Sequence, residues 1–174
     1  MTDARFKNCI DRICSDDREG LRLIYEDYEP LIYRAVFDIL GNRENAEDVT
    51  ADFFLKIWEI AGTYKPGGGH RCWLVTIARN MALDLIRKRK HEELTDEIPE
   101  DADLQTESAP ESVIADVAFE QTIAPLNEKE RQVLTLKFVG ELTFEEIARV
   151  TGEPPGTVSW RYRTAIAKLR KERP

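Results

Sequence analysis

The sequence predicts an all-α protein made of two small helical domains joined by a flexible acidic linker, with a helix-turn-helix as the second domain. Three observations predict this fold class. Apolar residues recur at helical spacing through most of the chain, residues 92–112 contain nine acidic and no basic side chains, and two capping signals precede a sharp turn near residue 155. With 174 residues, of which 42% are hydrophobic, the chain is long enough for two small domains.

The first forty residues carry two helical patterns. Residues 1–15 have a weak apolar pattern, which predicts a short or frayed helix. Asp16 and Asp17 then resemble an N-terminal cap for a longer apolar pattern that ends at Gly41. Pro30 interrupts this pattern, so we expect either a kink or two abutting helices with Pro30 in a first turn.

A helix is predicted from about Asn45 to Ala61, and its two faces differ. The face that should be buried carries Val49, Phe53, Ile57 and Ile60. The exposed face carries Asp48, Asp52, Leu55 and Glu59. An acidic patch bordered by large aromatic residues is typical of a protein–protein contact, with Trp58 as a candidate hot spot. The alternative is that Trp58 covers the edge of the core.

Residues 62–69 should form a loop, because Pro66 and three successive glycines disfavour a helix. The helix that follows, from His70 to His91, has an apolar stripe that consists of Leu74, Ile77, Ala78, Met81 and Leu85. Its opposite face is polar and cationic and carries Thr76, Arg79, Asn80, Arg87 and Lys90. The basic run at 87–90 is either a solvated face or a nucleic-acid surface.

Residues 92–112 have the composition of a linker, with two prolines, strong charge and no apolar period. The domains are therefore placed at residues 1–91 and 113–174. Because the total net charge is −8 and the linker contributes −9, the rest of the chain sums to +1. Basic residues cluster at 71–90 and 161–173, so one negative segment separates two positive surfaces. Fully extended, the linker could span up to about 70 Å.

The second domain contains the helix-turn-helix pattern. A first helix is expected from about Glu111 to Ala124. Asn127 and Thr143 each precede a glutamate by three residues, which predicts a capping box at the start of the next two helices. Residues 153–156 should form a tight turn before a last helix from about Thr157 to Lys171.

The outer face of this last helix is the candidate DNA-reading surface. Trp160, Arg163 and Thr164 project from it, with Arg161 and Lys168 at its flank. In such a motif, outer residues near the helix start contact base edges, whereas flanking Arg and Lys contact phosphates. The alternative is a helical hairpin with a solvated basic face, which the two capping boxes and the sharp turn disfavour.

Several classes of protein are disfavoured by the sequence. No apolar run approaches the roughly 18 residues needed to span a bilayer, and the N-terminus lacks a signal-peptide pattern, so a cytoplasmic protein is expected. Cys9, Cys14 and Cys72 lack the spacing of a disulfide framework or a zinc site. His70 and His91 form no catalytic constellation, and neither a P-loop nor GxGxxG occurs. We therefore expect no enzyme activity, no cofactor and no metal.

Three ordered blocks of the sequence resemble a known family. They are NAEDVTADFFLKIWE (45–59), HRCWLVTIARNMALDLIRKRK (70–90) and LNEKERQVLTLKFVGELTFEEIARVTGEPPGTVSWRYRTAIAKLRK (126–171). These blocks resemble bacterial RNA polymerase sigma factors of the extracytoplasmic-function (ECF) group, and the match covers nearly all of residues 20–172. Three blocks in order are far more specific than a lone helix-turn-helix.

The resemblance implies a role for each domain. The first would bind core RNA polymerase, at the clamp helices of its largest subunit, through Asp48, Asp52, Leu55, Lys56 and Trp58. It would also bind the melted minus-10 promoter element through Tyr64, Arg79, Asn80, Asp84, Arg87 and Lys88. The second would contact the polymerase flap region and bind the minus-35 element through Thr157, Ser159, Trp160, Arg161, Arg163, Thr164 and Lys168. The resemblance also implies promoter DNA and an anti-sigma factor as partners, with no membrane insertion.

Some positions depart from the family pattern. Ser159, Trp160 and Thr164 stand where other residue types are common, so the promoter sequence cannot be transferred from the family. The glycines at 67–69 make the base-capturing loop unusually free, and residues 153–155 replace the usual apolar and small residues of the turn. A stand-alone helix-turn-helix regulator is the alternative function; it would explain residues 126–171 but not the aromatic and acidic helix at 45–59.

Overall fold

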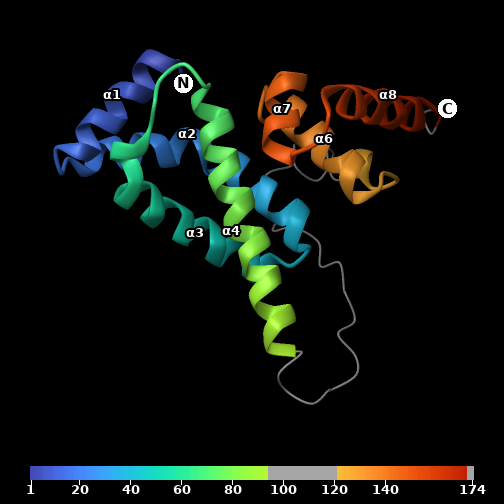
Figure 1. The fold of residues 1–174 in the computed structure, drawn as a ribbon, viewed down its shortest axis with the longest axis horizontal. Coiled ribbons are helices and arrows are strands. Elements are labelled where there is room, and N and C mark those ends of the chain that lie inside the picture. The colour runs from blue at the N-terminus through green and yellow to red at the C-terminus, as the bar shows by residue number, and fades with distance from the viewer. Residues whose placement is uncertain (94–120, 172–174) are drawn as a thin grey trace. The chain divides into compact units, whose positions relative to one another are not determined.

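The computed structural model describes residues 1–93 and 121–171, and within these ranges the chain forms helices and no strand, so the predicted all-α class is confirmed. The chain separates into two compact units. The first contains α1 (Asp3–Cys14), α2 (Arg18–Leu40), α3 (Arg43–Ile60), the short 3-10 helix η1 (Ala61–Thr63) and α4 (His70–Glu93) (Figure 1). The second contains α6 (Glu128–Phe138), α7 (Phe144–Thr151) and α8 (Pro155–Lys171).

Helix α1 is longer and better formed than the short or frayed helix that the sequence predicts. The Thr2 hydroxyl accepts a hydrogen bond from the amide of Arg5 and caps its first turn. Phe6, Cys9, Ile10 and Ile13 are buried, whereas Cys14 at its last position is exposed. Burial against α2 stabilises a helix whose local pattern looked weak, because helices in proteins are held mostly by tertiary packing.

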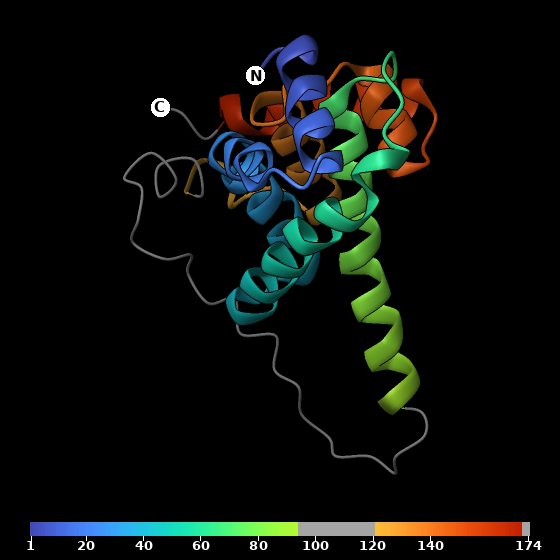
Figure 2. The same ribbon diagram turned by 90° about the vertical axis from the view of Figure 1, so that its left-hand side faces the viewer.

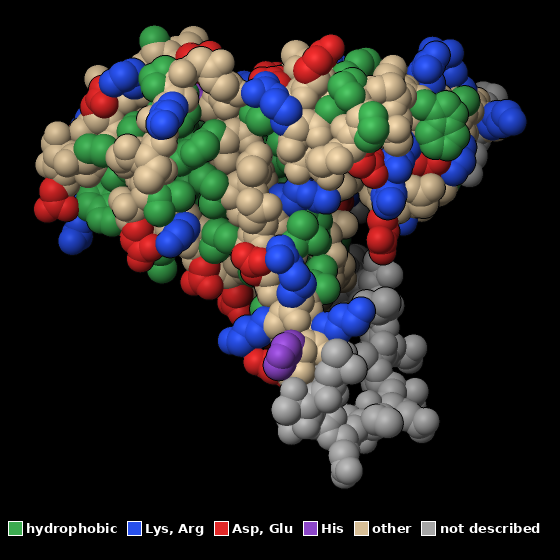
Figure 3. All heavy atoms as spheres, in the orientation of Figure 1, with side chains coloured by type: hydrophobic (Ala, Val, Ile, Leu, Met, Phe, Trp, Pro, Cys, Tyr) green, Lys and Arg blue, Asp and Glu red, His purple; other side chains and the backbone are tan. Residues whose placement is uncertain are grey.

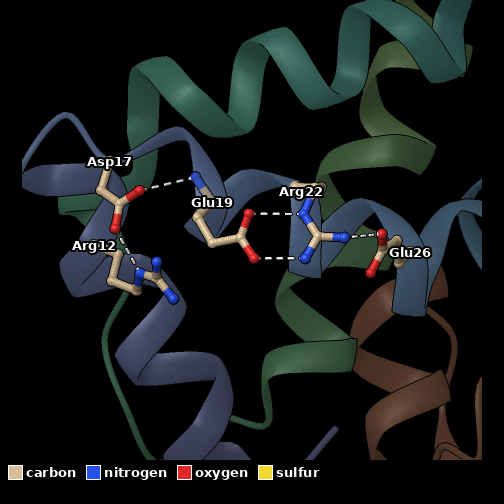
Figure 4. Close-up of polar contacts among 5 residues, drawn as sticks. All are labelled: Arg12, Asp17, Glu19, Arg22 and Glu26. Carbon is tan, nitrogen blue, oxygen red and sulfur yellow. Dashed lines mark hydrogen bonds and ion pairs between the residues drawn. The ribbon is translucent and has the colours of Figure 1, made fainter.

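The corner between α1 and α2 is held by a chain of charged side chains (Figure 4). The Asp17 carboxylate caps α2 by accepting a hydrogen bond from the Glu19 amide at 3.0 Å, as predicted, and it also pairs with Arg12 of α1 at 2.7 Å. Arg22 pairs with Glu19 and Glu26 along the exposed side of α2. Gly20 lies where α1 approaches, since a Cβ there would be 2.5 Å from the carbonyl oxygen of Cys9. Helix α2 runs unbroken through Pro30, so the alternative of two abutting helices is wrong.

The core of the first unit lies between α2, α3 and α4. Its fully buried members include Ile24, Ile32, Phe53, Ile57 and Leu74. The predicted stripe on α4 is only partly correct: Leu74 and Ala78 are buried, but Ile77, Met81 and Leu85 are half-buried. Val75 and Ala82 are buried instead, because α4 packs against both α2 and α3 and its buried face is rotated accordingly. The last turns of α4 extend beyond the other helices of this unit in both ribbon views (Figure 2).

The second unit is a helix-turn-helix with both predicted capping boxes in place. Asn127 with Glu130 caps α6, and Thr143 with Glu146 caps α7. Gly152 ends α7 in the left-handed conformation, with φ of +71°. Helix α8 begins at Pro155, two residues earlier than predicted, because proline is well suited to a first helical position. The expected helix at 111–124 lies mostly outside the described residues.

The core of this unit joins α8 to α6 and to the segment that precedes α6. Buried Ile123, Leu126, Leu134 and Ala165 pack with the partly buried Tyr162, Ile166 and Leu169. Val158 and Ile147 are also fully buried and pack α8 against α7. Among the helices that the structure describes, none has an apolar stretch long enough to cross a bilayer.

Candidate polymerase and nucleic-acid interfaces

The outer face of α3 is exposed and mixes carboxylates with one apolar side chain. Asp48, Asp52 and Lys56 are exposed, and Leu55 has 64% of its surface accessible. Lys56 pairs with Glu59 at 3.2 Å on the same face. Trp58 is half-buried, so it covers the edge of the core and still offers part of its ring to the surface. The exposed Leu55 with charged side chains beside it on the same face has the composition of a protein-binding patch.

Tyr25 of α2 adds to the apolar surface of this unit. Its ring centroid lies 4.7 Å from that of Phe54, and 48% of its own surface is exposed. Sequence reasoning missed Tyr25, because it lies outside the apolar stripe of its own helix. The contact of Tyr25 with Phe54 depends on how α2 packs against α3.

The loop between η1 and α4 is packed against the core at its ends, and its middle residues are exposed. Tyr64 is half-buried, with its ring centroid 5.0 Å from Phe6 and 5.1 Å from Trp73, so part of the predicted stacking surface is already occupied. Burial raises the pKa of Tyr64. Residues 65–68 are exposed, and Gly67 and Gly69 have positive φ angles of 102° and 79°.

The polar ridge of α4 is exposed along its last turns. Asn80, Asp84, Arg87 and Lys88 are exposed, and Arg79 is half-buried. Arg87 pairs with Asp84 at 2.9 Å, one helical turn away, and Lys88 lies 4.0 Å from Glu92. Figure 3 shows Lys and Arg side chains around this projecting end of the helix. Ion pairs this exposed contribute little to stability. Arg87 and Lys88 can therefore leave a carboxylate for a phosphate with little loss of free energy.

The outer face of α8 carries the predicted base-reading residues. Trp160 has 58% of its surface exposed and Arg163 is exposed, whereas Thr157, Ser159 and Thr164 are half-buried. The Thr164 hydroxyl donates a hydrogen bond to the carbonyl of Trp160 at 3.0 Å. The exposed indole of Trp160 and the exposed guanidinium of Arg163, whose Nε donates to the Ser159 carbonyl at 3.4 Å, offer both apolar contact and hydrogen-bond donors to a groove.

Two predicted phosphate contacts on α8 are engaged inside the unit. The Arg161 guanidinium pairs with Glu153 in the turn before α8, and its side chain is only 14% exposed. The Lys168 ammonium donates to both carboxylate oxygens of Glu130 at 2.7 and 2.8 Å. These contacts fix α8 to the turn and to α6, and contact of either cation with a phosphate stays a prediction.

His70, at the first position of α4, is buried with a partner at each ring nitrogen. Its Nε2 is hydrogen-bonded to the Tyr28 hydroxyl, and its Nδ1 is paired with the Asp3 carboxylate. Burial raises the pKa of Tyr28 to about 12, so the phenol is protonated at neutral pH. The hydrogen bond from His70 lowers the pKa of Asp3. Within the described residues, no group of three His, Cys, Asp or Glu side chains could hold a metal ion.

The comparisons with known proteins match both units. Residues 24–92 match the family described as sigma-70 region 2, and residues 123–171 match sigma-70 region 4. The chain belongs to the sigma-70 family, in its extracytoplasmic-function group. A stand-alone helix-turn-helix regulator would account for region 4 but not for region 2, so the comparisons do not support that alternative.

Relatives of this sigma factor include ECF sigma factors from two bacteria. It is 29% identical to BldN of Streptomyces coelicolor over 95% of this chain and 66% of BldN. It is 28% identical to SigW of Bacillus subtilis over 95% of both chains. The fold is shared with the sigma factor RpoE of Bartonella quintana, which was crystallised with the anti-sigma factor NepR. That structure has a TM-score of 0.64 and 23% identity over 90% of this chain and 95% of RpoE.

The candidate interfaces described above fall within the two ranges that the family matches. Region 2 contains the α3 face, the loop and the α4 ridge, and region 4 contains α6, α7 and α8. Helix α1 lies outside both matched ranges. Sequence reasoning missed that α1 reaches the start of α4, because Asp3 and His70 are 67 residues apart and no local pattern links them.

Proposed function

We propose that this sigma factor binds core RNA polymerase through the outer face of α3 and directs the enzyme to promoters through α4 and α8. The observation that carries the proposal is the arrangement of the three surfaces. An acidic and apolar face on α3 accompanies an exposed cationic ridge on α4 in one unit, and a helix-turn-helix forms the other.

The polymerase contact involves Asp48, Asp52, Leu55, Lys56 and Trp58, which meet the clamp helices of the largest subunit. Leu55 and the exposed part of Trp58 supply apolar area, and the carboxylates surround it. A central apolar contact with a charged rim gives both affinity and orientation. The second unit contacts the flap region of the same enzyme.

The minus-10 element is held as a melted strand. Melting without ATP requires that unstacked bases gain compensating contacts, such as stacking or hydrogen bonds to their exposed edges. The ridge residues Arg79, Asn80, Asp84, Arg87 and Lys88 meet this strand, and the loop that starts at Tyr64 captures a flipped base. The exposed, cationic last turns of α4 suit a single strand, whose phosphates remain accessible.

The minus-35 element is read as a duplex by α8. The candidate base-reading residues lie between the first turn and the middle of this helix: Thr157, Ser159, Trp160, Arg163 and Thr164. The N-terminal part of a recognition helix is the part that meets base edges. Trp160 contributes apolar contact with a thymine methyl group.

The protein has no catalytic activity of its own and acts in the cytoplasm, where its polymerase and its promoters are. An anti-sigma factor restrains it until a stimulus releases it. This part of the proposal is supported by RpoE of Bartonella quintana, which shares the fold and was crystallised with an anti-sigma factor.

Run-off transcription with purified core polymerase on genomic fragments tests the proposal. Core enzyme with this chain should yield promoter-dependent transcripts that core enzyme alone does not. Asp52→Lys should lower the affinity for core polymerase about tenfold, because it replaces a negative charge by a positive one in a contact that favours acidic side chains on this chain. Glu47→Lys is the matched control, because it makes the same charge change on another side of α3. A folded protein that yields no promoter-dependent product on any fragment would contradict the proposal.

A further inference from the structure

Phe6 of α1 lies between the two ends of the loop that joins η1 to α4. Its side chain is fully buried. The Tyr64 ring, at the start of the loop, packs edge-on at 5.0 Å, and the His70 ring, at the end of the loop, stacks at 4.7 Å with an interplanar angle of 21°. One side chain of α1 therefore supports both ends of this loop.

Hydrogen bonds fix the His70 end of the loop more firmly than stacking alone. The Tyr28 hydroxyl is hydrogen-bonded to Nε2 of His70, and Nδ1 of His70 is hydrogen-bonded to the Asp3 carboxylate. The imidazole thus joins α2, α1 and α4. Rotation of the buried ring would break both hydrogen bonds and separate its nitrogen atoms from these partners, although the Asp3 carboxylate itself is exposed to water.

The middle of the loop has no comparable constraint. Residues 65–68 are exposed, and no side-chain atom lies within 4 Å of the Cβ position at Gly67 or Gly68. A flexible segment that must hold an extruded base loses conformational entropy on binding, and that cost is smaller when its ends are already fixed. The precision of the loop therefore depends on its two anchored ends.

We infer that Asp3, Phe6 and His70 are positioning residues that hold the loop for its contact with the melted minus-10 strand. This inference rests on the proposed function of the loop. It assigns α1, which lies outside both ranges matched by the family, a part in promoter opening. None of the three side chains touches DNA; they act through the loop.

Two variants test the anchor without removing the core. His70→Phe keeps a ring that can stack on Phe6 but loses both hydrogen bonds. Asp3→Ala loses the carboxylate, and the Asp3 side chain is 74% exposed, so the fold does not depend on its burial. Asp11→Ala is the matched control, because it removes an exposed carboxylate of α1 that pairs with Lys7 at 2.6 Å.

The first measurement is amide hydrogen exchange of residues 64–73 in the full chain, which does not depend on the proposed function. Exchange should rise by about fivefold in Asp3→Ala, which loses one ordinary hydrogen bond, and by more than that in His70→Phe, which loses two. It should be unchanged in Asp11→Ala. Equal exchange in all four proteins would overturn the inference.

The second measurement is promoter opening by the holoenzyme, followed through permanganate reactivity of unpaired thymines. Asp3→Ala should open a duplex promoter about fivefold less, and His70→Phe less still, with unchanged affinity for core polymerase in both variants. A promoter already unpaired at the minus-10 element should restore most of this loss, because strand separation no longer has to be offset by loop contacts. An equal defect on both promoters would overturn the role in opening. A wild-type holoenzyme that opens no promoter would instead contradict the proposed function, and the exchange result would still decide whether the loop is anchored.

Discussion

The cations of α4 and those of α8 look alike in the sequence and differ in the structure. On α4, Arg87 and Lys88 lie beside carboxylates of their own helix at a fully exposed surface. On α8, Arg161 and Lys168 pair with Glu153 and Glu130 on other elements, and the Glu130 side chain is only 4% exposed. A basic residue on a candidate DNA-binding helix can therefore fix that helix to neighbouring elements of its own unit.

The energies of the two kinds of pair explain the difference. An exposed pair one turn apart on a helix is worth about 0.3–0.5 kcal/mol, so Arg87 can leave Asp84 for a phosphate with little loss. Separation of Lys168 from Glu130 would leave a carboxylate with little access to water, and breaking such buried pairs costs several-fold more. Arg87 and Lys88 of α4 are therefore available to a nucleic acid at low cost, whereas Arg161 and Lys168 of α8 would first have to leave their partners in the fold.

The largest expected effect comes from Glu130→Ala. Glu130 accepts a hydrogen bond from the Asn127 amide in the capping box and also holds Lys168. Loss of both contacts should lower the unfolding free energy of the second unit by about 3 kcal/mol. Glu146→Ala is the matched control, because it disrupts the equivalent capping box of α7, and it should cost about 1 kcal/mol. Hydrogen exchange of α6 and α8 amides measures both. Equal losses would show that the pair with Lys168 adds nothing.

The same contrast shows what the sequence could and could not predict. The capping boxes at Asn127 and Thr143 and the cap at Asp17 were predicted correctly, because each depends on residues within three positions. Pairs between distant residues could not be predicted in this way. Lys168 and Glu130 are 38 positions apart, and their pairing depends on how α6 packs against α8.

Burial was predicted less well on α4 than on the outer face of α3. The outer face of α3 followed the simple period, so Asp48, Asp52 and Leu55 are exposed as expected. On α4 the buried face is shifted, because α2 and α3 cover it from two sides.

The next effect concerns specificity and comes from Arg163→Ala. Arg163 is exposed on α8, in contrast to Arg161. If it reads a base, its loss should weaken holoenzyme binding to the preferred minus-35 sequence by about 2 kcal/mol and relax the preference at one position. Arg170→Ala is the control, since an exposed arginine near the helix end should weaken binding to all sequences alike. Binding titrations by fluorescence anisotropy on cognate and scrambled duplexes separate the two, and unchanged binding on every duplex would remove Arg163 from the reading surface.

The smallest expected effect tests the comparison most directly, through the salt dependence of binding. Arg87→Gln should lower the slope of log affinity against log salt by about 0.7 for a promoter fragment melted at the minus-10 element, because one contact with a single-strand phosphate is lost. Arg161→Gln should leave this slope unchanged, since its guanidinium pairs with Glu153 and only 14% of its side chain is exposed. Both slopes come from the same titrations of holoenzyme at several salt concentrations. If Arg161→Gln lowered the slope as much as Arg87→Gln, the two cations would have the same role, and the distinction between the exposed ridge of α4 and the anchored flank of α8 would be wrong.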